Sequence, residues 1–130
     1  MSLATLANSE LSVMDLLWRE GQLTARQIRE QLYADDTKAQ HGTVQRLLQR
    51  LEEKGFVARD KDLPVHLFAP LLSREDYASG QLESLANKLT GGSVAPLITH
   101  LIDHKKISGA ELDKLKQIIN AFDGEESRHD

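Results

Sequence analysis

The segment 42–55 and the run that follows it constrain the fold of this chain more than any other part of the sequence. Its apolar residues recur at i, i+3, i+4 and i+7, which is the spacing of one face of an α-helix. These residues are Val44, Leu47, Leu48 and Leu51. Gly55 stands where a helix-terminating glycine is expected, and a turn at 60–64 separates two β-branched and aromatic runs. The pattern predicts a helix over 41–54, followed by a β-hairpin.

A second, shorter helix is predicted immediately before this one, over residues 25–34. Thr24 and Gln27 have the spacing of a capping box, in which each side chain bonds the other residue's backbone N–H. Ile28 and Leu32 give the helix a short inward face. Two helices joined by a polar connection, with a hairpin as a wing, are typical of a winged helix-turn-helix.

A first helix is predicted to begin after the N-cap residue Asn8 and to end near Glu20, before Gly21. Its apolar residues form a broad stripe that we expect to be buried: Leu11, Val13, Met14, Leu17 and Trp18. We interpret Trp18 as core filling, with a stacking role on a ligand as the less favoured alternative.

The two strands of the hairpin are predicted over 56–61 and 65–70, and residues 22–23 would add a short strand beside them. In the second strand, successive side chains fall into two sets that alternate with a period of two. The alternating sets are Val65, Leu67 and Ala69 against His66 and Phe68. We interpret His66 as a side chain that points outward from its strand, with a phosphate contact as the less favoured alternative.

The composition excludes several classes of protein. A chain of 130 residues forms one domain, or one small domain with an appendage. Without cysteine it has no disulfide, no thiolate nucleophile and no thiolate metal site. Its apolar runs are shorter than the roughly 18 residues that a membrane span needs, and its start lacks the basic residues of a signal peptide. We therefore expect a cytoplasmic protein with no membrane association.

The net charge of −4 argues against a nucleic-acid binder, but the charge is unevenly distributed. The segment 38–61 holds six basic against three acidic residues, a local charge of +3. The basic residues are Lys38, Arg46, Arg50, Lys54, Arg59 and Lys61. The segment 73–130 holds seven basic against ten acidic residues, a local charge of −3. Positive charge is thus concentrated on the predicted helix and wing. Because this local charge is modest, we expect that tight binding of nucleic acid needs a dimer.

The outer face of the helix 41–54 carries guanidinium and amide groups, which pair bidentately with guanine and adenine edges in the major groove of DNA. The candidates for contacts with bases and the nearby backbone are Thr43, Gln45, Arg46 and Gln49. The candidates for phosphate contacts are the backbone at Ala25 and the side chains of Arg26, Arg50, Arg59 and Lys61. An ordinary solvated helix is the alternative interpretation of the same residues.

After Pro70 the sequence changes to three short amphipathic helices without strands of their own. Their predicted N-caps are Ser73, Ser93 and Ser108, and a glycine pair at 91–92 breaks the first helix from the second. The apolar stripes need a partner surface, for which we favour a second copy of the chain over the N-terminal domain. The expected dimerisation residues are Leu82, Leu85, Leu89, Leu97, Leu101, Leu112, Leu115, Ile118, Ile119 and Phe122.

The predicted fold class is therefore mainly α with a small β wing. A winged-helix DNA-binding domain is expected over residues 1–72, and a helical dimerisation region over residues 73–123. The charged segment 124–130 is expected to be a disordered tail.

Four segments together resemble the penicillinase-repressor family of bacterial winged-helix transcriptional regulators. That family includes the repressors of β-lactamase and methicillin-resistance genes and their copper-responsive relatives. The segments are residues 11–18, 23–28, 42–57 and 89–92. The resemblance implies an N-terminal winged helix, a C-terminal helical dimerisation region and repression by binding an inverted-repeat operator.

The chain departs from the family pattern in ways that concern its operator and its inducing signal. Family members commonly place Arg directly after the Thr-Val or Thr-Ile pair, whereas here Gln45 takes that position and Arg46 follows. In penicillinase repressors a membrane sensor protease cleaves an Asn-Phe bond, and His100 and Leu101 stand in its place here. The C-terminal cysteines of the copper-responsive relatives are absent from this sequence.

Other functions remain open as alternatives. His100 and His104 share a helix face and, with Asp103 or a partner chain, have the spacing of metal ligands. We favour the polar edge of a dimer helix for this pair, and predict no metal site, no cofactor and no catalytic residues. A winged-helix module that binds protein instead of DNA is a second hypothesis. An effector-responsive regulator with a ligand site at a dimer interface is a third.

Overall fold

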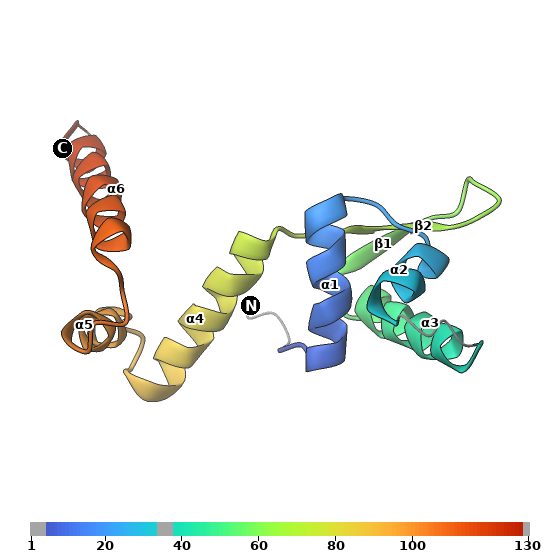
Figure 1. Ribbon diagram of the computed structural model, residues 1–130. Coiled ribbons are helices and arrows are strands. Elements are labelled where there is room, and N and C mark those ends of the chain that lie inside the picture. Colours follow the sequence, from blue (N-terminus) through green and yellow to red (C-terminus); the bar gives the residue numbers. More distant parts are fainter. Residues whose placement is uncertain (1–4, 34–37, 129–130) are drawn as a thin grey trace. The chain divides into compact units, whose positions relative to one another are not determined.

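The computed structural model describes residues 5–33 and 38–128, leaving aside the side chains of 38–39 and 123–128. The described part is mainly helical with one two-stranded antiparallel sheet, which confirms the predicted fold class. The chain divides into two compact units, residues 1–84 and the remainder. Figure 1 shows α1, α2 and α3 grouped together in the first unit, with the hairpin of β1 and β2 extending away from them.

The elements of the first unit follow the predicted order of three helices and a hairpin. They are α1 (Asn8–Glu20), α2 (Ala25–Leu32), α3 (Lys38–Glu53), β1 (Val57–Asp60), β2 (Leu67–Pro70) and the first part of α4 (Arg74–Leu89). Thr24 and Gln27 form the predicted capping box: Gln27 N–H donates to Thr24 Oγ1 at 3.1 Å, and Thr24 N–H donates to Gln27 Oε1 at 2.8 Å. This box fixes the start of α2.

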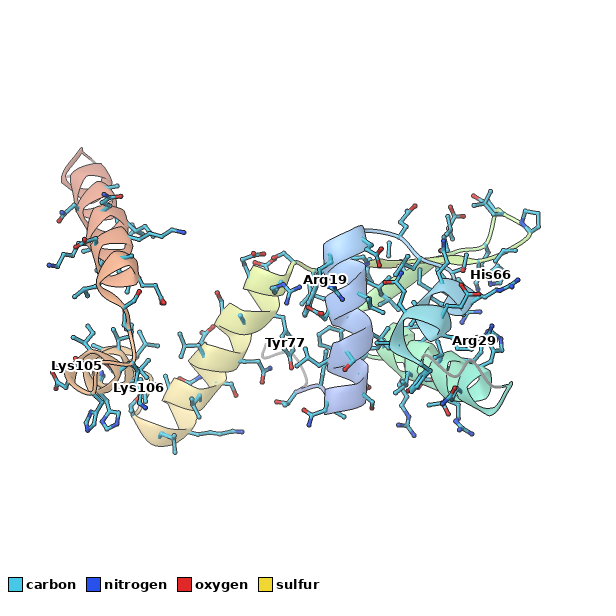
Figure 2. The ribbon with its side chains drawn as sticks, in the orientation of Figure 1. Arg19, Arg29, His66, Tyr77, Lys105 and Lys106 are labelled. Atoms are coloured by element: carbon cyan, nitrogen blue, oxygen red, sulfur yellow. The ribbon has the colours of Figure 1, made fainter. Side chains whose placement is uncertain are left out.

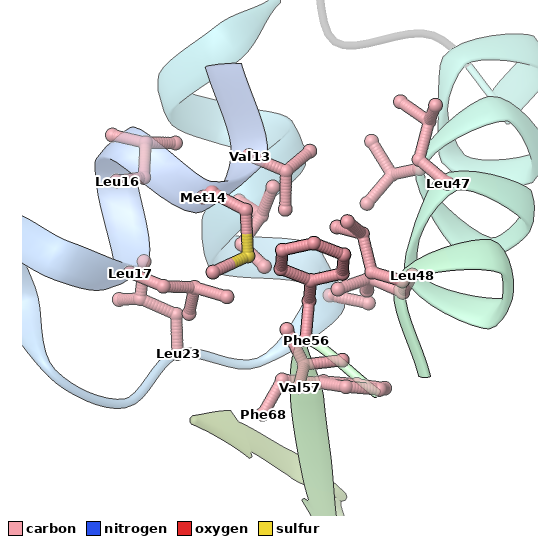
Figure 3. Packing of buried hydrophobic residues seen from close by; sticks show 14 of the residues in the cluster. Val13, Met14, Leu16, Leu17, Leu23, Leu47, Leu48, Phe56, Val57 and Phe68 are labelled. Carbon is pink, nitrogen blue, oxygen red and sulfur yellow. The ribbon is translucent and has the colours of Figure 1, made fainter. Parts of the chain in front are cut away.

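Phe56, between α3 and β1, lies at the centre of the core. Figure 3 shows its ring between Met14 of α1 and Leu48 of α3. The largest fully buried side chains come from all three helices and the wing: Val13, Met14, Leu17, Ile28, Val44, Leu48, Leu51, Phe56 and Val57. Burial of each such side chain contributes about 1.5–3 kcal/mol, and α3 owes its fixed orientation to this packing.

The buried stripe of α1 is rotated from the predicted one. Leu16 is buried, whereas Leu11 is 36% exposed and its predicted burial is wrong. The stripe follows Glu10, Val13, Met14 and Leu17, at i, i+3, i+4 and i+7, so Leu11 falls on its flank.

The residue that caps α1 also differs from the prediction. Ala7 is the N-cap, and Asn8 is the first residue of the helix. Ala7 N–H donates to Glu10 Oε1 at 2.9 Å, which is the reciprocal half of a capping box. The Glu10 carboxylate thus accepts the backbone N–H of the N-cap residue, Ala7. Asn8, the predicted N-cap, lies within the helix instead.

A Schellman motif ends α3 at Gly55. The φ of Gly55 is 84°, Phe56 N–H donates to Leu51 O at 2.9 Å, and Gly55 N–H donates to Glu52 O at 3.1 Å. A residue with a Cβ rarely adopts this φ, so glycine is required here. The turn brings Phe56 into the core and starts the wing.

The wing pairs Arg59 of β1 opposite Phe68 of β2. Of the short strand predicted over 22–23, the structure has an isolated bridge: Leu23 pairs with Phe68, with N to O distances of 3.1 Å and 2.8 Å in the two directions. Phe68 is 2% exposed and Val65 is 61% exposed, so the inner side of β2 is the Phe68 side. His66 lies half-buried beside Arg59, and its predicted outward position is wrong. Phe68, and not the alternating set that begins at Val65, takes the inner position because its aromatic ring buries more apolar area.

The first turns of α4 pack on the first unit. Tyr77 is directed toward α1 (Figure 2), and its hydroxyl oxygen accepts a hydrogen bond from Leu6 N–H at 3.0 Å. Trp18 Nε1–H donates to Leu72 O at 2.9 Å, and its ring packs against the core, as predicted. These contacts join the start of α4 to the first unit, which extends to Ser84. The winged-helix domain over 1–72 and the dimerisation region over 73–123 stay predictions.

The second unit holds the end of α4, together with α5 (Ala95–Asp103) and α6 (Gly109–Arg128). The φ angles of Gly91 and Gly92 are 66° and 101°, so the predicted glycine break after α4 is present.

The structure agrees with the predicted N-cap of α6 and differs from that of α5. Ser108 Oγ accepts Glu111 N–H at 3.2 Å, which confirms Ser108 as a cap. The cap of α5 is Val94 and not Ser93.

The last helix, α6, reaches Arg128 and so enters the segment 124–130, which was predicted to be disordered. Glu and Arg favour helix, which accounts for the continuation. Within the described residues, no helix has the length and apolar character needed to cross a membrane.

Candidate nucleic-acid interface

The outward face of α3 is a continuous polar strip. Gln45, Arg46, Gln49 and Arg50 are all exposed, on the side opposite the buried stripe that begins at Val44. Gln45 Nε2 lies 3.3 Å from His41 Nε2, and Gln49 Nε2 donates to Glu53 Oε1 at 3.3 Å. These contacts within the helix orient the two amides along the strip. Thr43, the fourth residue predicted to contact bases, is half-buried on the flank of the strip.

Two of the basic residues predicted to create a positive field are paired inside the fold. Lys54 Nζ lies 2.8 Å from Glu10 Oε2, and Arg59 Nη2 lies 3.2 Å from Glu52 Oε1. Their charge is therefore largely balanced before any ligand arrives. Arg46 and Arg50 are exposed on α3, and Lys61 is exposed on the wing.

Arg59 occupies the inner side of the wing. Its guanidinium lies 4.8 Å from the centre of the Phe68 ring, and Nη1 lies 3.4 Å from His66 Nδ1. The side chain is 23% exposed. Arg59 is thus held in one orientation by an aromatic face, a carboxylate and an imidazole.

The start of α2 places Arg26 and Ala25 next to the same side of the wing. Arg26 is exposed and forms an ion pair with Glu30, with Nε 3.0 Å from Oε1. Ala25 is nearly buried, which leaves its backbone as the group available for a phosphate contact. A cavity of about 340 Å³ lies here, and Ala25, Arg26, His41, Gln45, Arg59 and His66 are among its lining residues.

The candidate dimerisation residues differ in exposure. Leu82, Leu85, Leu89, Leu101, Ile118, Ile119 and Phe122 are exposed, while Leu97, Leu112 and Leu115 are half-buried.

His100 lies in the last turn of α5, and His104 is the C-cap of that helix. The rings of His100 and His104 stack with their centres 4.0 Å apart. No cluster of three or more His, Cys, Asp or Glu side chains suited to a metal ion occurs among the described residues. Leu101, beside His100, is exposed on the same helix.

His41 and Tyr77 were not among the residues predicted to contribute to this site or to its support. His41 faces the wing because it precedes Gln45 by one helical turn, and this spacing was visible in the sequence. Tyr77 has polar neighbours in the sequence, so no local pattern predicted its burial. Its role follows only from the hydrogen bond that its hydroxyl oxygen accepts from Leu6 N–H.

A helix pair, a third helix with a polar outer face and a two-stranded wing define a winged helix-turn-helix protein. The chain belongs to the penicillinase repressor family, whose family model matches residues 6–121.

Individual relatives are similar along most of their length. The penicillinase repressor of Bacillus licheniformis is 25% identical over 114 residues, which cover 88% of this chain and 88% of the relative. The transcriptional regulator BlaI of Mycobacterium tuberculosis (strain H37Rv) is 32% identical over 119 residues, covering 90% and 84%. The methicillin resistance regulatory protein MecI of Staphylococcus aureus (strain N315) is 24% identical over 115 residues, covering 88% and 93%. Family members are transcriptional repressors and not enzymes.

Among solved structures, the solution structure of the DNA binding domain of the repressor BlaI is similar at 26% identity. The match covers 59% of this chain and 94% of that chain, with a TM-score of 0.49.

Proposed function

We propose that this chain is a homodimeric transcriptional repressor that binds an inverted-repeat DNA operator. In this proposal α3 enters the major groove, the wing lies along the backbone, and α4, α5 and α6 couple two such heads. Repression follows because the bound dimer excludes RNA polymerase from an overlapping promoter. Membership of the penicillinase repressor family supports the repressor role.

The polar strip on α3 is the observation that carries DNA binding. Arg46 and Gln49 lie one helical turn apart on the exposed side. The guanidinium offers two donors to a guanine edge, and the amide offers a donor and an acceptor to an adenine edge. The opposite side of α3 is locked by Leu48 and Leu51, which are completely buried. A rigid helix that presents bidentate hydrogen-bonding groups is suited to direct readout of base sequence.

Exposed apolar side chains in the second unit support a dimer. Ile118, Ile119 and Phe122 are each 57% exposed on α6, and Leu89 at the end of α4 is 67% exposed. Single exposed apolar residues are common, but such an accumulation in one small unit is typical of an interaction surface. A second copy of the chain is the partner that a two-fold symmetric operator requires.

The charge balance also favours two heads over one. Because Lys54 and Arg59 are paired with carboxylates, the net positive charge that each head presents to phosphates is reduced. Non-specific affinity rises with the number of phosphates neutralised, so a dimer doubles what one head supplies.

The experiment is selection of binding sites from a randomised duplex pool, followed by fluorescence-anisotropy titration of the enriched sequences at two salt concentrations. The expected result is an inverted repeat bound by one dimer, with affinity that falls as salt rises. The control is the Arg46→Ala/Gln49→Ala variant, which keeps the core of α3 and should enrich no sequence. Weak binding without enrichment by the unmodified chain would contradict the repressor proposal and favour a protein-binding module.

A further inference from the structure

The histidine pair at the end of α5 has no part in the proposed function. His100 and His104 are both exposed, and the backbone N–H of His104 donates to His100 O at 3.1 Å. The two residues are therefore one helical turn apart, and their rings lie together with centres 4.0 Å apart. Two imidazoles at this spacing are the arrangement that helical metal sites use.

A second hydrogen bond determines which nitrogen of His104 can bind a ligand. His104 Nδ1 lies 3.0 Å from His100 O. A carbonyl oxygen can only accept, so Nδ1 carries the proton and Nε2 of the neutral ring keeps its lone pair. Histidines that bind metals commonly donate their other ring N–H to a backbone carbonyl, which orients the ring. In His104 this supporting hydrogen bond is part of the fold.

The turn that ends α5 holds the backbone of His104 in place. Lys106 N–H donates to Leu101 O at 2.8 Å. Lys105 N–H donates to Ile102 O at 3.0 Å, which completes a Schellman motif. Lys105 has a φ of 56°, in the left-handed region that usually belongs to glycine. Backbone and side-chain hydrogen bonds together thus fix one ligand position.

His100 would supply the second ligand, and its ring is free to adjust. No hydrogen bond of the His100 ring to the other described residues accompanies the stacking on His104. A metal ion lies in the plane of each imidazole that binds it, so the stacked rings must turn apart to share one ion. The side-chain torsions of His100 allow this, because χ2 of histidine has a broad energy minimum. The pair therefore combines one oriented ligand with one adjustable ligand.

The ligand chemistry selects the class of metal. Neutral imidazole suits Zn²⁺, Cu²⁺ and Ni²⁺, whereas Mg²⁺ prefers oxygen ligands. Among these ions Cu²⁺ generally forms the strongest complex with a given nitrogen site. Within the described part of the chain, no third His, Cys, Asp or Glu completes a cluster with the pair, so water would take the remaining coordination positions.

The charges next to the pair distinguish coordination from simple attraction of cations. Asp103, Lys105 and Lys106 are all exposed, giving one acidic against two basic side chains. Lys105 and Lys106 lie at the end of α5 (Figure 2). Such surroundings do not attract cations by charge, so binding would depend on the imidazole lone pairs. The site should therefore distinguish between metals of equal charge.

We propose that His100 and His104 chelate one divalent transition-metal ion of the class Cu²⁺, Zn²⁺ or Ni²⁺. The hydrogen bond from His104 Nδ1 is the observation that favours this interpretation over the polar helix edge predicted from the sequence. The site lies wholly in the second unit and uses no residue of the proposed DNA-binding face. The inference is thus independent of DNA binding, and either proposal can fail without the other.

Isothermal titration calorimetry of the full-length chain, prepared without an affinity tag, tests the site at neutral pH. The probes are the chlorides of Zn²⁺, Cu²⁺ and Mg²⁺. We expect saturable binding of Zn²⁺, tighter binding of Cu²⁺ and no binding of Mg²⁺ at the same concentrations. Equal binding of Mg²⁺ and Zn²⁺ would overturn the proposal, because it would show attraction by charge alone.

Two single variants test whether both rings bind the ion. His104→Asn keeps an amide N–H near the place of Nδ1 but has no atom in the place of Nε2. It should weaken Zn²⁺ binding by at least about tenfold, and His100→Asn should do the same. His66→Asn, which removes a histidine of the first unit, should leave the Zn²⁺ affinity unchanged. An effect of only one of the two α5 variants, or of neither, would overturn the chelate.

Hydrogen exchange followed by NMR gives a readout that binding elsewhere on the surface would not move. The N–H groups of His104, Lys105 and Lys106 donate to carbonyls in the last turn of α5. An ion that bridges the two rings should slow their exchange, by about 100-fold at a Zn²⁺ concentration 100 times the Kd if opening of the turn releases the ion. His104→Asn should show no such change. Unchanged exchange in the unmodified chain at saturating Zn²⁺ would overturn chelation across this turn.

Discussion

Lys54 Nζ lies 2.8 Å from Glu10 Oε2 and 3.0 Å from Glu10 Oε1, so one ammonium bonds both oxygens of a carboxylate that is only 3% exposed. The same carboxylate accepts Ala7 N–H at 2.9 Å. This ion pair joins the residue that follows α3 to the first turn of α1. It fixes the position of α3 in the first unit, and it withdraws a lysine from the positive field of the proposed DNA-binding face.

Glu10→Gln should lower the free energy of unfolding by about 1–3 kcal/mol at neutral pH, because it removes one charge of a pair whose lysine is partly solvated. Burial acts to raise the pKa of Glu10, but the hydrogen bonds from Lys54 and Ala7 outweigh it and hold the pKa below its ordinary value of 4.5. The ionised carboxylate therefore stabilises the fold above pH 4.5, and this contribution is lost as the pH falls through the lower folded pKa.

Urea unfolding at a series of pH values tests this prediction. The difference between Glu10→Gln and the unmodified chain should shrink progressively below pH 4.5. Glu83→Gln, at an exposed carboxylate on α4, should leave stability unchanged throughout. A pH-independent difference for Glu10→Gln would show that the ion pair is not its cause.

Tyr77→Phe should lower the free energy of unfolding by about 1–2 kcal/mol, because it leaves the buried Leu6 N–H without its acceptor. The ring contacts with Phe56 and Trp18, at 5.8 Å and 5.9 Å between centres, would be retained. Urea unfolding followed by Trp18 fluorescence measures the change. Tyr33→Phe is the matched control, since no hydrogen bond of the Tyr33 hydroxyl occurs among the described residues; an equal loss in both variants would refute the role of the Leu6 bond.

The sequence was sufficient to predict elements whose signals are local. The capping box of Thr24, the glycine stop at Gly55 and the apolar stripe beginning at Val44 depend on residues within a few positions of one another. Local geometry also placed Arg46 and Gln49 on the exposed side of α3, because the helical period relates that side directly to the buried one.

The predictions that were wrong concern features that depend on residues distant in the sequence. Asn8 lost its predicted capping role because Glu10 is held at the helix start by Lys54, which lies 44 positions away. Alternation in β2 gave two possible inner sides, and burial of Phe68 against the core selected the one that also brings His66 beside Arg59. No local pattern distinguishes these alternatives, so the cavity beside the wing was not predictable from sequence.

Arg46→Ala should weaken binding to the selected inverted repeat by about 1–3 kcal/mol if Arg46 pairs with a base. Binding to a random duplex should change little, because a base contact contributes to specific binding alone. Anisotropy titration of both duplexes measures the two effects side by side. Arg19→Ala, at an exposed arginine of α1, is the matched removal of charge away from α3. Equal weakening on both duplexes would reduce Arg46 to a phosphate contact.

Arg59→Ala should instead weaken binding to both duplexes by a similar factor. It should also flatten the dependence of log affinity on log salt by about one unit for each phosphate that the variant no longer neutralises. Titrations at several salt concentrations give the slope, and Arg19→Ala again supplies the control. Because Arg59 also packs on Phe68 and pairs with Glu52, the folded fraction of the variant must be checked by circular dichroism. A folded variant with an unchanged slope would remove Arg59 from the phosphate-binding residues.

Phe122→Asp should shift the chain from dimer toward monomer, because it places a charge in the apolar surface of α6 that the proposed interface would bury. Sedimentation equilibrium should show a dimer affinity weakened by at least about tenfold, which corresponds to about 1.4 kcal/mol. Leu71→Asp alters an equally exposed apolar side chain, at 60%, in the first unit and should leave the dimer intact. If operator binding needs both heads, Phe122→Asp also loses affinity for the inverted repeat while keeping the fold of the first unit. A dimer that survives Phe122→Asp would place the interface elsewhere on the chain.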